Sequence, residues 1–459
     1  MPSQTRRDLS RTVKAYDVRG VVPDDLDEAV ATALGEAFAR LVGKDGATRV
    51  VIAYDMRESS IPLSRAFADG VRKRGLDVLD AGLGSTDMLY FASGHLDAPG
   101  AMFTASHNPA RYNGIKLCRA GAAPIGQDSG LAEIRETAAE LLANPGDDSK
   151  TGTIEQVEIL DAYARHLRSL VDLDGCRPLR VVVDAGNGMA GHTVPAVFKS
   201  LPIEIVPMYF ELDGDFPNHE ANPLDPANLV DLQKRVQQEH ADAGLAFDGD
   251  ADRCFVIDER GECVSPSAIT ALVAVRELAK HPGGTIIHNL ITSRAVPDIV
   301  KEHGGEPVRT RVGHSFIKAE MARTDAVFGG EHSAHYYFRD FWRADTGMLA
   351  ALHVLSALSE HGGPLSALTA RFDRYASSGE INSTVDDQAE CTAKVALAYE
   401  GRPGVVTDRM DGLTVTLADG CWFNLRPSNT EPLLRLNVEA PDADRMEVLR
   451  DEVLSLIRE

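Results

Sequence analysis

Three segments of the chain repeat one pattern of apolar and polar positions. In each, a continuous run of mostly β-branched residues leads through a polar turn into residues with helical periodicity. A run without alternation is typical of a strand that is buried on both faces of a parallel sheet. Because the copies lie more than one hundred residues apart, they predict three related α/β domains. The expected strand and helix of each copy are 49–55 and 62–74, 179–184 and 193–201, and 284–289 and 295–303.

The last ninety residues follow a different pattern. Short segments alternate between apolar and polar positions and are joined by turn residues, and a helical segment closes the chain. The alternation predicts strands that are buried on one face only, so a small α+β domain is expected here. The expected elements are strands at 413–417, 421–425 and 433–438 and a helix at 442–458, whose apolar face is Met446, Leu449, Val453 and Ile457.

These patterns predict an α/β protein of four domains, three of them related and the fourth a C-terminal α+β domain. A chain of 459 residues is too long for one hydrophobic core. At roughly 100–150 residues per domain, its length alone predicts about three to four domains. The predicted boundaries are 1–155, 156–257, 258–370 and 371–459.

Composition and charge exclude several classes of partner. Hydrophobic residues make up 44% of the chain and charged residues 25%, as in a soluble globular protein. The net charge of −22 repels nucleic acid and anionic membranes, so neither is expected to bind. No apolar run approaches the roughly 18 residues of a membrane span. The six cysteines form no CxxC pair, which predicts reduced thiols in a cytoplasmic protein.

The segment 104–109, with the sequence TASHNP, predicts a bent loop that presents Ser106. It follows an apolar strand at 100–103, and Asn108 favours extended backbone because it precedes proline. A serine on a sharp turn at a strand end is a common place for a nucleophile. The segment alone is equally compatible with a surface turn that proline closes.

Lys116 is the candidate cation near Ser106. Asn113 and Gly114 are typical of a hairpin turn, which predicts that the chain folds back and brings Lys116 toward Ser106. A solvated lysine on a strand is the alternative interpretation.

A candidate metal site lies at 248–253, with the sequence DGDADR. On extended backbone Asp248, Asp250 and Asp252 would point to one side, where three carboxylates need a cation. Hard oxygen ligands favour Mg²⁺ or Ca²⁺. The adjacent Arg253 adds a positive charge that a phosphate would require. A polar turn of acidic residues is the alternative.

Two further loops carry groups that suit a phosphorylated sugar. The loop 329–336 alternates Glu331, Ser333 and His335, a carboxylate, a hydroxyl and an imidazole that sugar hydroxyls would pair with. The loop 426–432 offers a guanidinium, hydroxyls, an amide and backbone N–H groups, which favour binding of a phosphate monoester. Its candidate residues are Arg426, Ser428, Asn429 and Thr430.

Together the four loops specify a nucleophilic serine, a divalent metal, readers of hydroxyl groups and a phosphate clamp. These are the parts of a phosphoryl-transfer site that acts on a phosphorylated polyol. In these motifs, and in their order and spacing, the chain resembles the α-D-phosphohexomutase superfamily, and most closely its bacterial phosphomannomutase/phosphoglucomutase branch. The resemblance runs from the segment 14–20 to the last domain.

The resemblance implies a role for each candidate residue. Ser106 matches the serine that is phosphorylated in the resting enzyme and that completes the Mg²⁺ ligands with Asp248, Asp250 and Asp252. It implies one Mg²⁺ per chain and a catalytic site in a central cleft between the four domains. The other catalytic matches are Lys116, His107, Arg19 and Arg253, and the substrate-binding matches are Tyr16, His314, Glu331, Ser333, His335, Arg426, Ser428, Asn429 and Thr430.

The reaction that the resemblance implies interconverts hexose 1-phosphates and hexose 6-phosphates. Phospho-Ser106 would phosphorylate a hydroxyl of the substrate, and the hexose 1,6-bisphosphate, also the expected activator, would return its other phosphate to Ser106. Lys116 is the candidate general base. The alternatives are a phosphoglucosamine mutase, a metal-dependent sugar phosphatase and a non-catalytic sugar-phosphate sensor. A monomer or a homodimer is expected.

Overall fold

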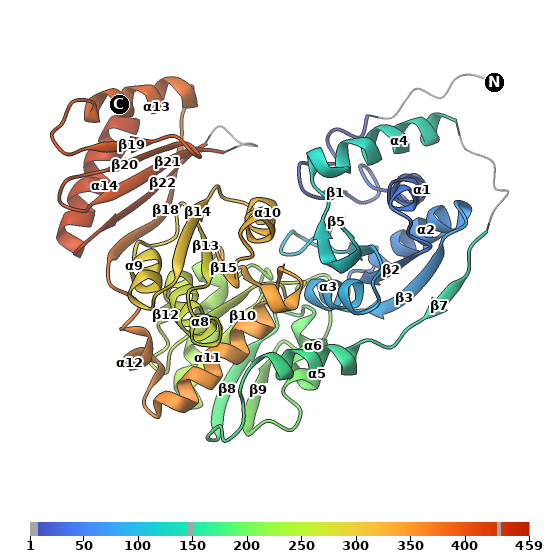
Figure 1. Ribbon diagram of the computed structural model, residues 1–459, viewed down its shortest axis with the longest axis horizontal. Helices are drawn as coiled ribbons and strands as arrows, with labels where there is room; N and C mark the ends of the chain where they lie inside the picture. Colours follow the sequence, from blue (N-terminus) through green and yellow to red (C-terminus); the bar gives the residue numbers. More distant parts are fainter. Residues whose placement is uncertain (1–7, 145–150, 429–432, 459) are drawn as a thin grey trace. The chain divides into compact units, whose positions relative to one another are not determined.

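The computed structural model of the chain describes residues 8–144, 151–428 and 433–458. The chain divides into two compact units, and each is described by itself (Figure 1). Unit 1 consists of Met1–Val264 and Ser333–Leu368, and unit 2 consists of Ser265–His332 and Thr369–Glu459. The boundaries predicted for four domains stay a prediction.

The first sheet of unit 1 is mixed, with the strand order β1-β5-β4-β2-β3-β7 and the short β6 beside β5. Strand β2 is parallel to β3 and β4, whereas β5 is antiparallel to β4 and β1. The strands are β1 (Val18–Val21), β2 (Arg49–Tyr54), β3 (Asp77–Leu83), β4 (Gly100–Phe103), β5 (Tyr112–Arg119), β6 (Ala123–Pro124) and β7 (Ile154–Gln156), and the helices are α1 (Glu28–Lys44), α2 (Ser60–Lys73), α3 (Thr86–His95) and α4 (Leu131–Ala143).

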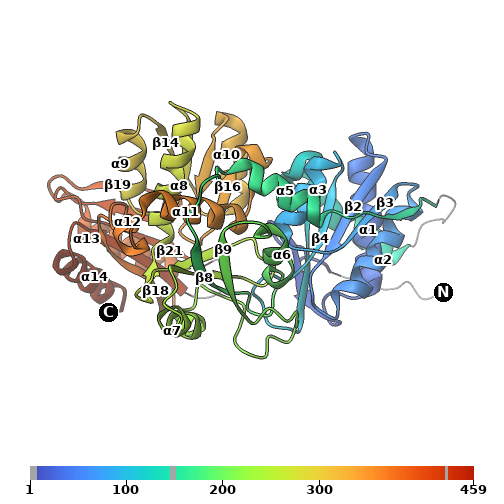
Figure 2. The same cartoon turned by 90° about the horizontal axis from the view of Figure 1, so that it is seen from below.

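Strand β2 is buried on both faces, as its continuous apolar run predicts. Val50 and Ile52 belong to the core that this sheet forms with α1, α2 and α4. Because side chains alternate along a strand, Val51 and Ala53 face the other side, where α3 packs on β2 and β4 (Figure 2). Helices α1 and α2 pack so closely that a Cβ on Gly35 would lie 2.1 Å from a backbone oxygen of α2.

The second sheet of unit 1 has the order β12-β11-β10-β8-β9. Strand β8 is parallel to β9 and β10, and β11 returns antiparallel to β10. Unit 1 also contains the antiparallel pair of β16 and β17. The strands are β8 (Leu179–Asp184), β9 (Ile203–Met208), β10 (Ala243–Phe247), β11 (Cys254–Ile257), β12 (Cys263–Val264), β16 (Tyr336–Phe338) and β17 (Ala344–Asp345), and the helices are α5 (Leu160–Leu170), α6 (Ala190–Val197), α7 (Val230–Gln238), α11 (Gly347–His361) and α12 (Leu365–Thr369), whose last residue lies in unit 2.

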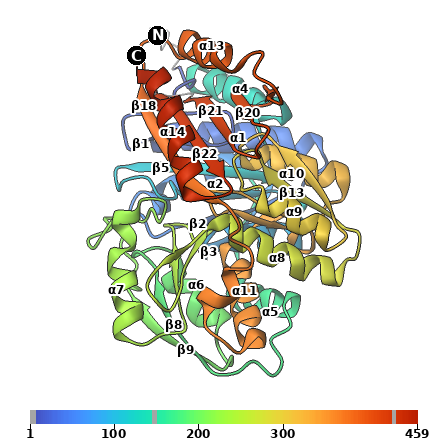
Figure 3. The same cartoon turned by 90° about the vertical axis from the view of Figure 1, so that its left-hand side faces the viewer.

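Unit 2 contains a parallel group of three strands and an antiparallel sheet of five. Strand β13 lies between β14 and β15, and the second sheet has the order β18-β22-β21-β20-β19, along which α14 packs (Figure 3). The elements are α8 (Pro266–Lys280), β13 (Thr285–Asn289), α9 (Ala295–Glu302), β14 (Glu306–Thr310), α10 (His314–Thr324), β15 (Phe328–Gly330), β18 (Ala376–Thr384), α13 (Gln388–Tyr399), β19 (Val406–Asp408), β20 (Leu413–Thr416), β21 (Trp422–Pro427), β22 (Leu433–Ala440) and α14 (Ala443–Arg458).

The sequence patterns predict some of these elements. Strand β8 has the predicted bounds, and the predicted apolar face of α14 is its buried face. Helix α6 ends at Val197 rather than at 201, because the chain turns at Ser200, which adopts a left-handed conformation with φ +74°. All six cysteines are free. Among the described residues, no helix combines the length and apolar character needed to cross a lipid bilayer.

Candidate active site

The serine loop, residues 104–111, joins β4 to β5 in unit 1. Ser106 adopts a left-handed backbone conformation with φ +49°. This conformation is uncommon for a residue other than glycine, and such strain is concentrated at functional sites. The backbone N–H of Ser106 donates to Oγ1 of Thr104 at 2.9 Å. Ser106 therefore lies on the predicted bend, and it is buried in this structure.

The prediction of a hairpin turn at Asn113 and Gly114 is wrong. Both residues lie inside β5, and the serine loop itself makes the turn that pairs Lys116 with Met102. A Cβ on Gly114 would lie 2.3 Å from the carbonyl oxygen of Val18, so glycine is required for the close approach of β1. The fold-back that brings Lys116 toward the serine loop is present, although its cause is different.

The aspartate loop, residues 248–252, joins β10 to β11 and is a turn rather than extended backbone. Ala251 is left-handed with φ +58°, and its N–H donates to the carbonyl oxygen of Asp248 at 3.0 Å. The three carboxylates converge because the chain turns around them. Ligand atoms of Asp248, Asp250 and Asp252 lie within 4.8 Å of one another, and all three side chains are buried.

The carboxylates of Asp250 and Asp252 each have one oxygen engaged and one open. Nζ of Lys116 lies 2.7 Å from Oδ2 of Asp250 and 2.6 Å from Oδ2 of Asp252. The hydroxyl of Thr86 also donates to Oδ2 of Asp250, at 2.5 Å. Within the described part of the chain, the two Oδ1 atoms are buried without a hydrogen-bond partner. Buried oxygens of this kind are costly unless a cation binds them, so the donor set fits Mg²⁺.

Ser106 contacts the aspartate loop directly. Its hydroxyl donates to Oδ2 of Asp248 at 2.8 Å, and Arg253 donates to the same oxygen from Nε at 2.9 Å. Nη2 of Arg253 also donates to Nδ1 of His107 at 2.6 Å. Because this lone pair of His107 accepts from a guanidinium, the imidazole is not placed as a base toward Ser106, whose Oγ is 3.2 Å away.

The electrostatics agree with these pairings. Burial, followed by the charges of Arg253 and Arg19, lowers the pKa of His107 to about 3, so its imidazole is neutral. Burial alone would lower the pKa of Lys116, but the nearby carboxylates outweigh it and hold this pKa well above its usual range. Burial raises the pKa of Asp248. Lys116 is therefore an ammonium ion in this arrangement, which makes it a proton donor.

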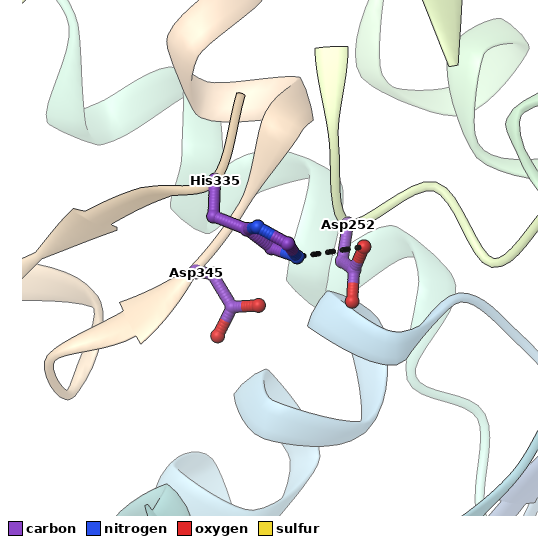
Figure 4. A group of neighbouring side chains, drawn as sticks. All are labelled: Asp252, His335 and Asp345. Carbon is purple, nitrogen blue, oxygen red and sulfur yellow. Dashed lines mark ion pairs between the residues drawn. The ribbon is translucent and has the colours of Figure 1, made fainter. Parts of the chain in front are cut away.

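The loop predicted to read sugar hydroxyls also turns instead of extending, because Ala334 is left-handed with φ +64°. In unit 1, the hydroxyl of Ser333 lies 2.9 Å from Nδ1 of His335. The other ring nitrogen of His335 points to Oδ1 of Asp252 at 3.9 Å, with the buried Asp345 on the same side (Figure 4). His335 is therefore placed beside the aspartate loop.

Glu331 and His314 lie in unit 2. Oε1 of the buried Glu331 accepts from Nδ2 of Asn289 at 3.1 Å and from the N–H of Gly313 at 3.3 Å. Gly313 immediately precedes α10, which begins at His314. Glu331 thus holds the segment that carries His314, and Asn289, at the end of β13, orients the carboxylate.

The described part of the predicted phosphate loop also lies in unit 2. Arg426 is in β21, and its guanidinium lies 3.7 Å from a carboxylate oxygen of Glu380 and 3.9 Å from one of Asp411. These separations exceed a hydrogen bond, so the guanidinium is near acidic groups without being locked by them. Arg435 is the cross-strand partner of Arg426 and adds a second guanidinium. Ser428 is buried, whereas Asn429 and Thr430 lie outside the described residues.

Arg19 anchors the serine loop from β1. Its Nη1 donates to the carbonyl oxygen of Ala105 at 3.0 Å and to the side chain of Asn108. Nη2 donates to Asp17 at 2.5 Å. Tyr16 is half-buried in the bend that precedes β1. The structure thus brings Arg19 to the serine loop together with the residues of the aspartate loop.

Three neighbours of the site have no motif that marks them in the sequence. Thr86 begins α3, after the N-cap Ser85, and this pattern identifies a helix start but not a contact with Asp250. Asp345 lies in the short strand β17. Arg57 follows β2 and donates to the carbonyl oxygen of Ser106 at 2.9 Å.

Comparison with known proteins places this arrangement in a family. Four domain models match in order along the chain. They are described as Phosphoglucomutase/phosphomannomutase, alpha/beta/alpha domain I (residues 10–144), alpha/beta/alpha domain II (161–261), alpha/beta/alpha domain III (265–375) and C-terminal domain (380–456). These matches confirm the predicted class of three α/β domains followed by a C-terminal domain.

Similar proteins match over nearly the full length. A phosphomannomutase of Escherichia coli is 41% identical over 97% of this chain and 98% of its own length. A protein of Xanthomonas campestris pv. campestris, described as phosphohexose mutases, is 43% identical with the same coverage. A crystal structure of a phosphoglucomutase/phosphomannomutase family protein from Burkholderia thailandensis matches with a TM-score of 0.87 and 33% identity, over 97% of each chain. The chain belongs to the phosphoglucomutase/phosphomannomutase family, within the α-D-phosphohexomutase superfamily of isomerases.

Proposed function

We propose that the chain is a phosphohexomutase that interconverts hexose 1-phosphates and hexose 6-phosphates through a phosphorylated Ser106. The observation that carries this proposal is the 2.8 Å hydrogen bond from the Ser106 hydroxyl to Asp248, inside a buried set of three carboxylates. A serine in this position can carry a phosphoryl group next to a divalent cation. The phosphomannomutase relative supports a hexose phosphate as the substrate.

In the forward step, a hydroxyl oxygen of the substrate attacks the phosphorus of phospho-Ser106. The new O–P bond forms while the bond between phosphorus and Oγ breaks, and Oγ keeps the electron pair of the broken bond and takes up a proton to become the Ser106 hydroxyl. The substrate hydroxyl gives up its proton to a base. Arg253 and the Lys116 ammonium stabilise the charge on the group in transfer, because both lie next to the serine and aspartate loops.

In the return step, Oγ of Ser106 attacks the other phosphate of the hexose 1,6-bisphosphate. The Ser106 hydroxyl must lose its proton, and Oδ2 of Asp248 accepts its hydrogen bond at 2.8 Å. The bond between that phosphorus and the sugar oxygen breaks, and the sugar oxygen keeps the electron pair and takes up a proton. The hexose leaves with one phosphate, so no phosphoryl group is gained or lost. Lys116 as the general base stays a prediction. Its pairing with Asp250 and Asp252 keeps it protonated, so it would have to lose its own proton before it could accept one.

Asp248, Asp250 and Asp252, with an oxygen of phosphorylated Ser106, would hold one Mg²⁺ per chain. When bound, the ion supplies Lewis-acid stabilisation of the phosphoryl oxygens. The open Oδ1 atoms of Asp250 and Asp252 support this assignment. A hexose 1,6-bisphosphate would serve as activator by phosphorylating Ser106 in molecules that have lost the group.

We assign recognition of the sugar to Glu331, Ser333 and His335. These side chains offer an acceptor, a hydroxyl and an imidazole, and each would lose a hydrogen bond to a substrate without the matching hydroxyl. We assign the phosphate that is not in transfer to the loop of Arg426. The full set proposed for substrate binding is Tyr16, His314, Glu331, Ser333, His335, Arg426, Ser428, Asn429 and Thr430.

The test is the intact mass of the purified chain together with its activity on mannose 1-phosphate and glucose 1-phosphate. We expect one phosphate per chain and conversion to the 6-phosphates when a trace of the bisphosphate is present. Ser106→Ala should lose both the phosphate and the turnover. Ser64→Ala is the matched control, since Ser64 is a buried serine that bonds only a backbone carbonyl in α2. Full activity of Ser106→Ala would refute the covalent mechanism, and release of inorganic phosphate would indicate a phosphatase.

A further inference from the structure

Arg57 is a buried arginine whose hydrogen bonds converge on the serine loop. Its side chain is 1% exposed, and it lies just after β2. A guanidinium has five N–H donors, and in this structure each has an acceptor. The donor pairs are Nε to Oδ2 of Asp55 (3.2 Å), Nη1 to the carbonyl oxygens of Pro109 (3.0 Å) and Tyr112 (3.1 Å), and Nη2 to those of Ser106 (2.9 Å) and Asn108 (2.7 Å).

Four of these five acceptors are backbone carbonyl oxygens of the segment 106–112. A loop that turns several carbonyls inward leaves buried acceptors that need donors. Only a guanidinium supplies five donors in a fixed plane, whereas a lysine has three and no planar geometry. Ser106, one of the four, has a left-handed backbone conformation. The direction of its carbonyl group therefore depends on a donor in a fixed position, which Arg57 supplies.

The guanidinium is itself held in place. Oδ1 of Asp55 accepts from the backbone N–H of Arg57 at 3.0 Å and from the hydroxyl of Ser60 at 2.6 Å. The ring of Phe216 lies 5.1 Å from Cζ of Arg57. A Cβ on Gly214 would lie 2.8 Å from Cα of Arg57, so glycine lets this segment approach. Arg57 therefore links the serine loop both to the end of β2 and to the segment 214–216.

We infer that Arg57 is a positioning residue for the phosphoryl transfer, and this inference rests on the proposed role of Ser106. By binding the carbonyls on both sides of His107, Arg57 fixes the backbone from which Oγ of Ser106 reaches Asp248. Its donors are all engaged by protein atoms, so it has none left for a substrate. Its loss would move the nucleophile without removing a substrate contact.

The expected signature is a fall in kcat without a comparable change in KM. Misplacing a reacting atom by about 1 Å costs about 100-fold in rate. We therefore expect Arg57→Lys and Arg57→Ala to lower kcat about 100-fold, with KM for glucose 1-phosphate within about threefold of wild type. Arg72→Ala is the matched control, because Nε of Arg72 also binds a backbone carbonyl, that of Gly152, away from the serine loop. The control should keep wild-type kcat.

Chemical rescue separates positioning from general loss of structure. A cavity of about 380 Å³, lined in part by Arg57, Ser59 and Arg111, offers a small ion access to the same place. Guanidinium at low millimolar concentration should raise kcat of Arg57→Ala about tenfold, and methylammonium should not. A kcat of Arg57→Lys within threefold of wild type, or equal rescue by both ions, would overturn the inference.

Hydrogen exchange of the segment 104–112 keeps the inference testable if Arg57→Ala fails to fold. We expect faster exchange in this segment of Arg57→Lys than in wild type, and unchanged exchange in Arg72→Ala. Equal exchange in Arg57→Lys and wild type would refute the role of Arg57 in holding this segment. If the wild-type chain shows no mutase activity, the proposed function fails, whereas the exchange measurement still decides whether Arg57 holds the loop.

Discussion

Lys116 is the resident cation of the aspartate loop, and its removal should make the fold of unit 1 depend on Mg²⁺. Its ammonium pairs with two buried carboxylates at 2.6 and 2.7 Å, and its side chain is 18% exposed. Breaking a buried ion pair by removing one partner costs about 3–5 kcal/mol. Unit 1 has about 300 residues, so at about 2.1 cal/mol/K per residue Lys116→Met should lower its melting temperature by about 5–8 °C in a chelator.

Magnesium should reverse most of this loss. An ion that binds only the folded state stabilises it by about 2.7 kcal/mol at a concentration 100 times its dissociation constant, or about 4 °C for unit 1. In the variant, Mg²⁺ no longer competes with the lysine for Asp250 and Asp252. The rise in melting temperature on adding Mg²⁺ should therefore be larger for Lys116→Met than for wild type.

Thermal melts of both proteins in a chelator and in saturating Mg²⁺ test this reasoning. Lys44→Met is the control, since Lys44 in α1 pairs with Glu133 of α4 on the surface of unit 1, where the two side chains are 66% and 46% exposed. Such exposed pairs contribute about 0–1 kcal/mol, so no dependence on Mg²⁺ is expected. If Lys116→Met and wild type have the same melting temperature in the chelator, the stabilising role of the Lys116 ion pairs is refuted. If Mg²⁺ raises the melting temperature of Lys116→Met no more than that of wild type, the assignment of this loop as a metal site is refuted.

Three further predictions concern residues around and away from the site. Thr86→Val removes the donor to Oδ2 of Asp250 and should raise the Mg²⁺ concentration for half-maximal activity about tenfold. Activity at low Mg²⁺ that equals that of wild type would contradict this prediction. Burial raises the pKa of Asp87 to about 6, so the folded state favours its neutral form and loses stability as pH rises through this value. Between pH 5 and 7 the wild type should lose about 1 kcal/mol relative to Asp87→Asn, and parallel melting curves would contradict this. Leu449→Ala, in the core of unit 2, should lower the free energy of unfolding by about 2–5 kcal/mol in denaturant titrations. Val448 is 69% exposed, so Val448→Ala should change this free energy by no more than about 0.5 kcal/mol.

The sequence predicts the elements that periodicity controls. Strand β8 and the buried face of α14 follow from apolar spacing, because burial is the term that dominates their stability. The sequence also singles out the three aspartates and Ser106 as candidates, since a carboxylate cluster and a serine three residues before a proline are local patterns. What the pattern could not give is the backbone at Ala251 and Ala334, where alternation indicated an extended loop and the chain turns instead.

Contacts between remote segments account for the rest. Arg57 lies 49 residues before Ser106 in the sequence, and Thr86 lies 164 residues before Asp250. Neither Arg57 nor Thr86 belongs to a motif. Gly114 is a residue type typical of turns, but here its lack of a side chain allows the close approach of β1. A glycine required by packing and one required by a turn look the same in a single sequence.

The division of the chain also determines when the site can be finished during synthesis. Unit 1 needs Ser333–Leu368, which the ribosome produces only after the whole of Ser265–His332. The hydrogen bond from Thr346 to the buried Asp87 at 2.7 Å joins residues 259 positions apart. A nascent chain that ends before residue 333 therefore contains the serine and aspartate loops but lacks His335 and Asp345. Unit 1 can complete its core only after most of the protein has left the ribosome, and no single cut of the chain yields either unit intact.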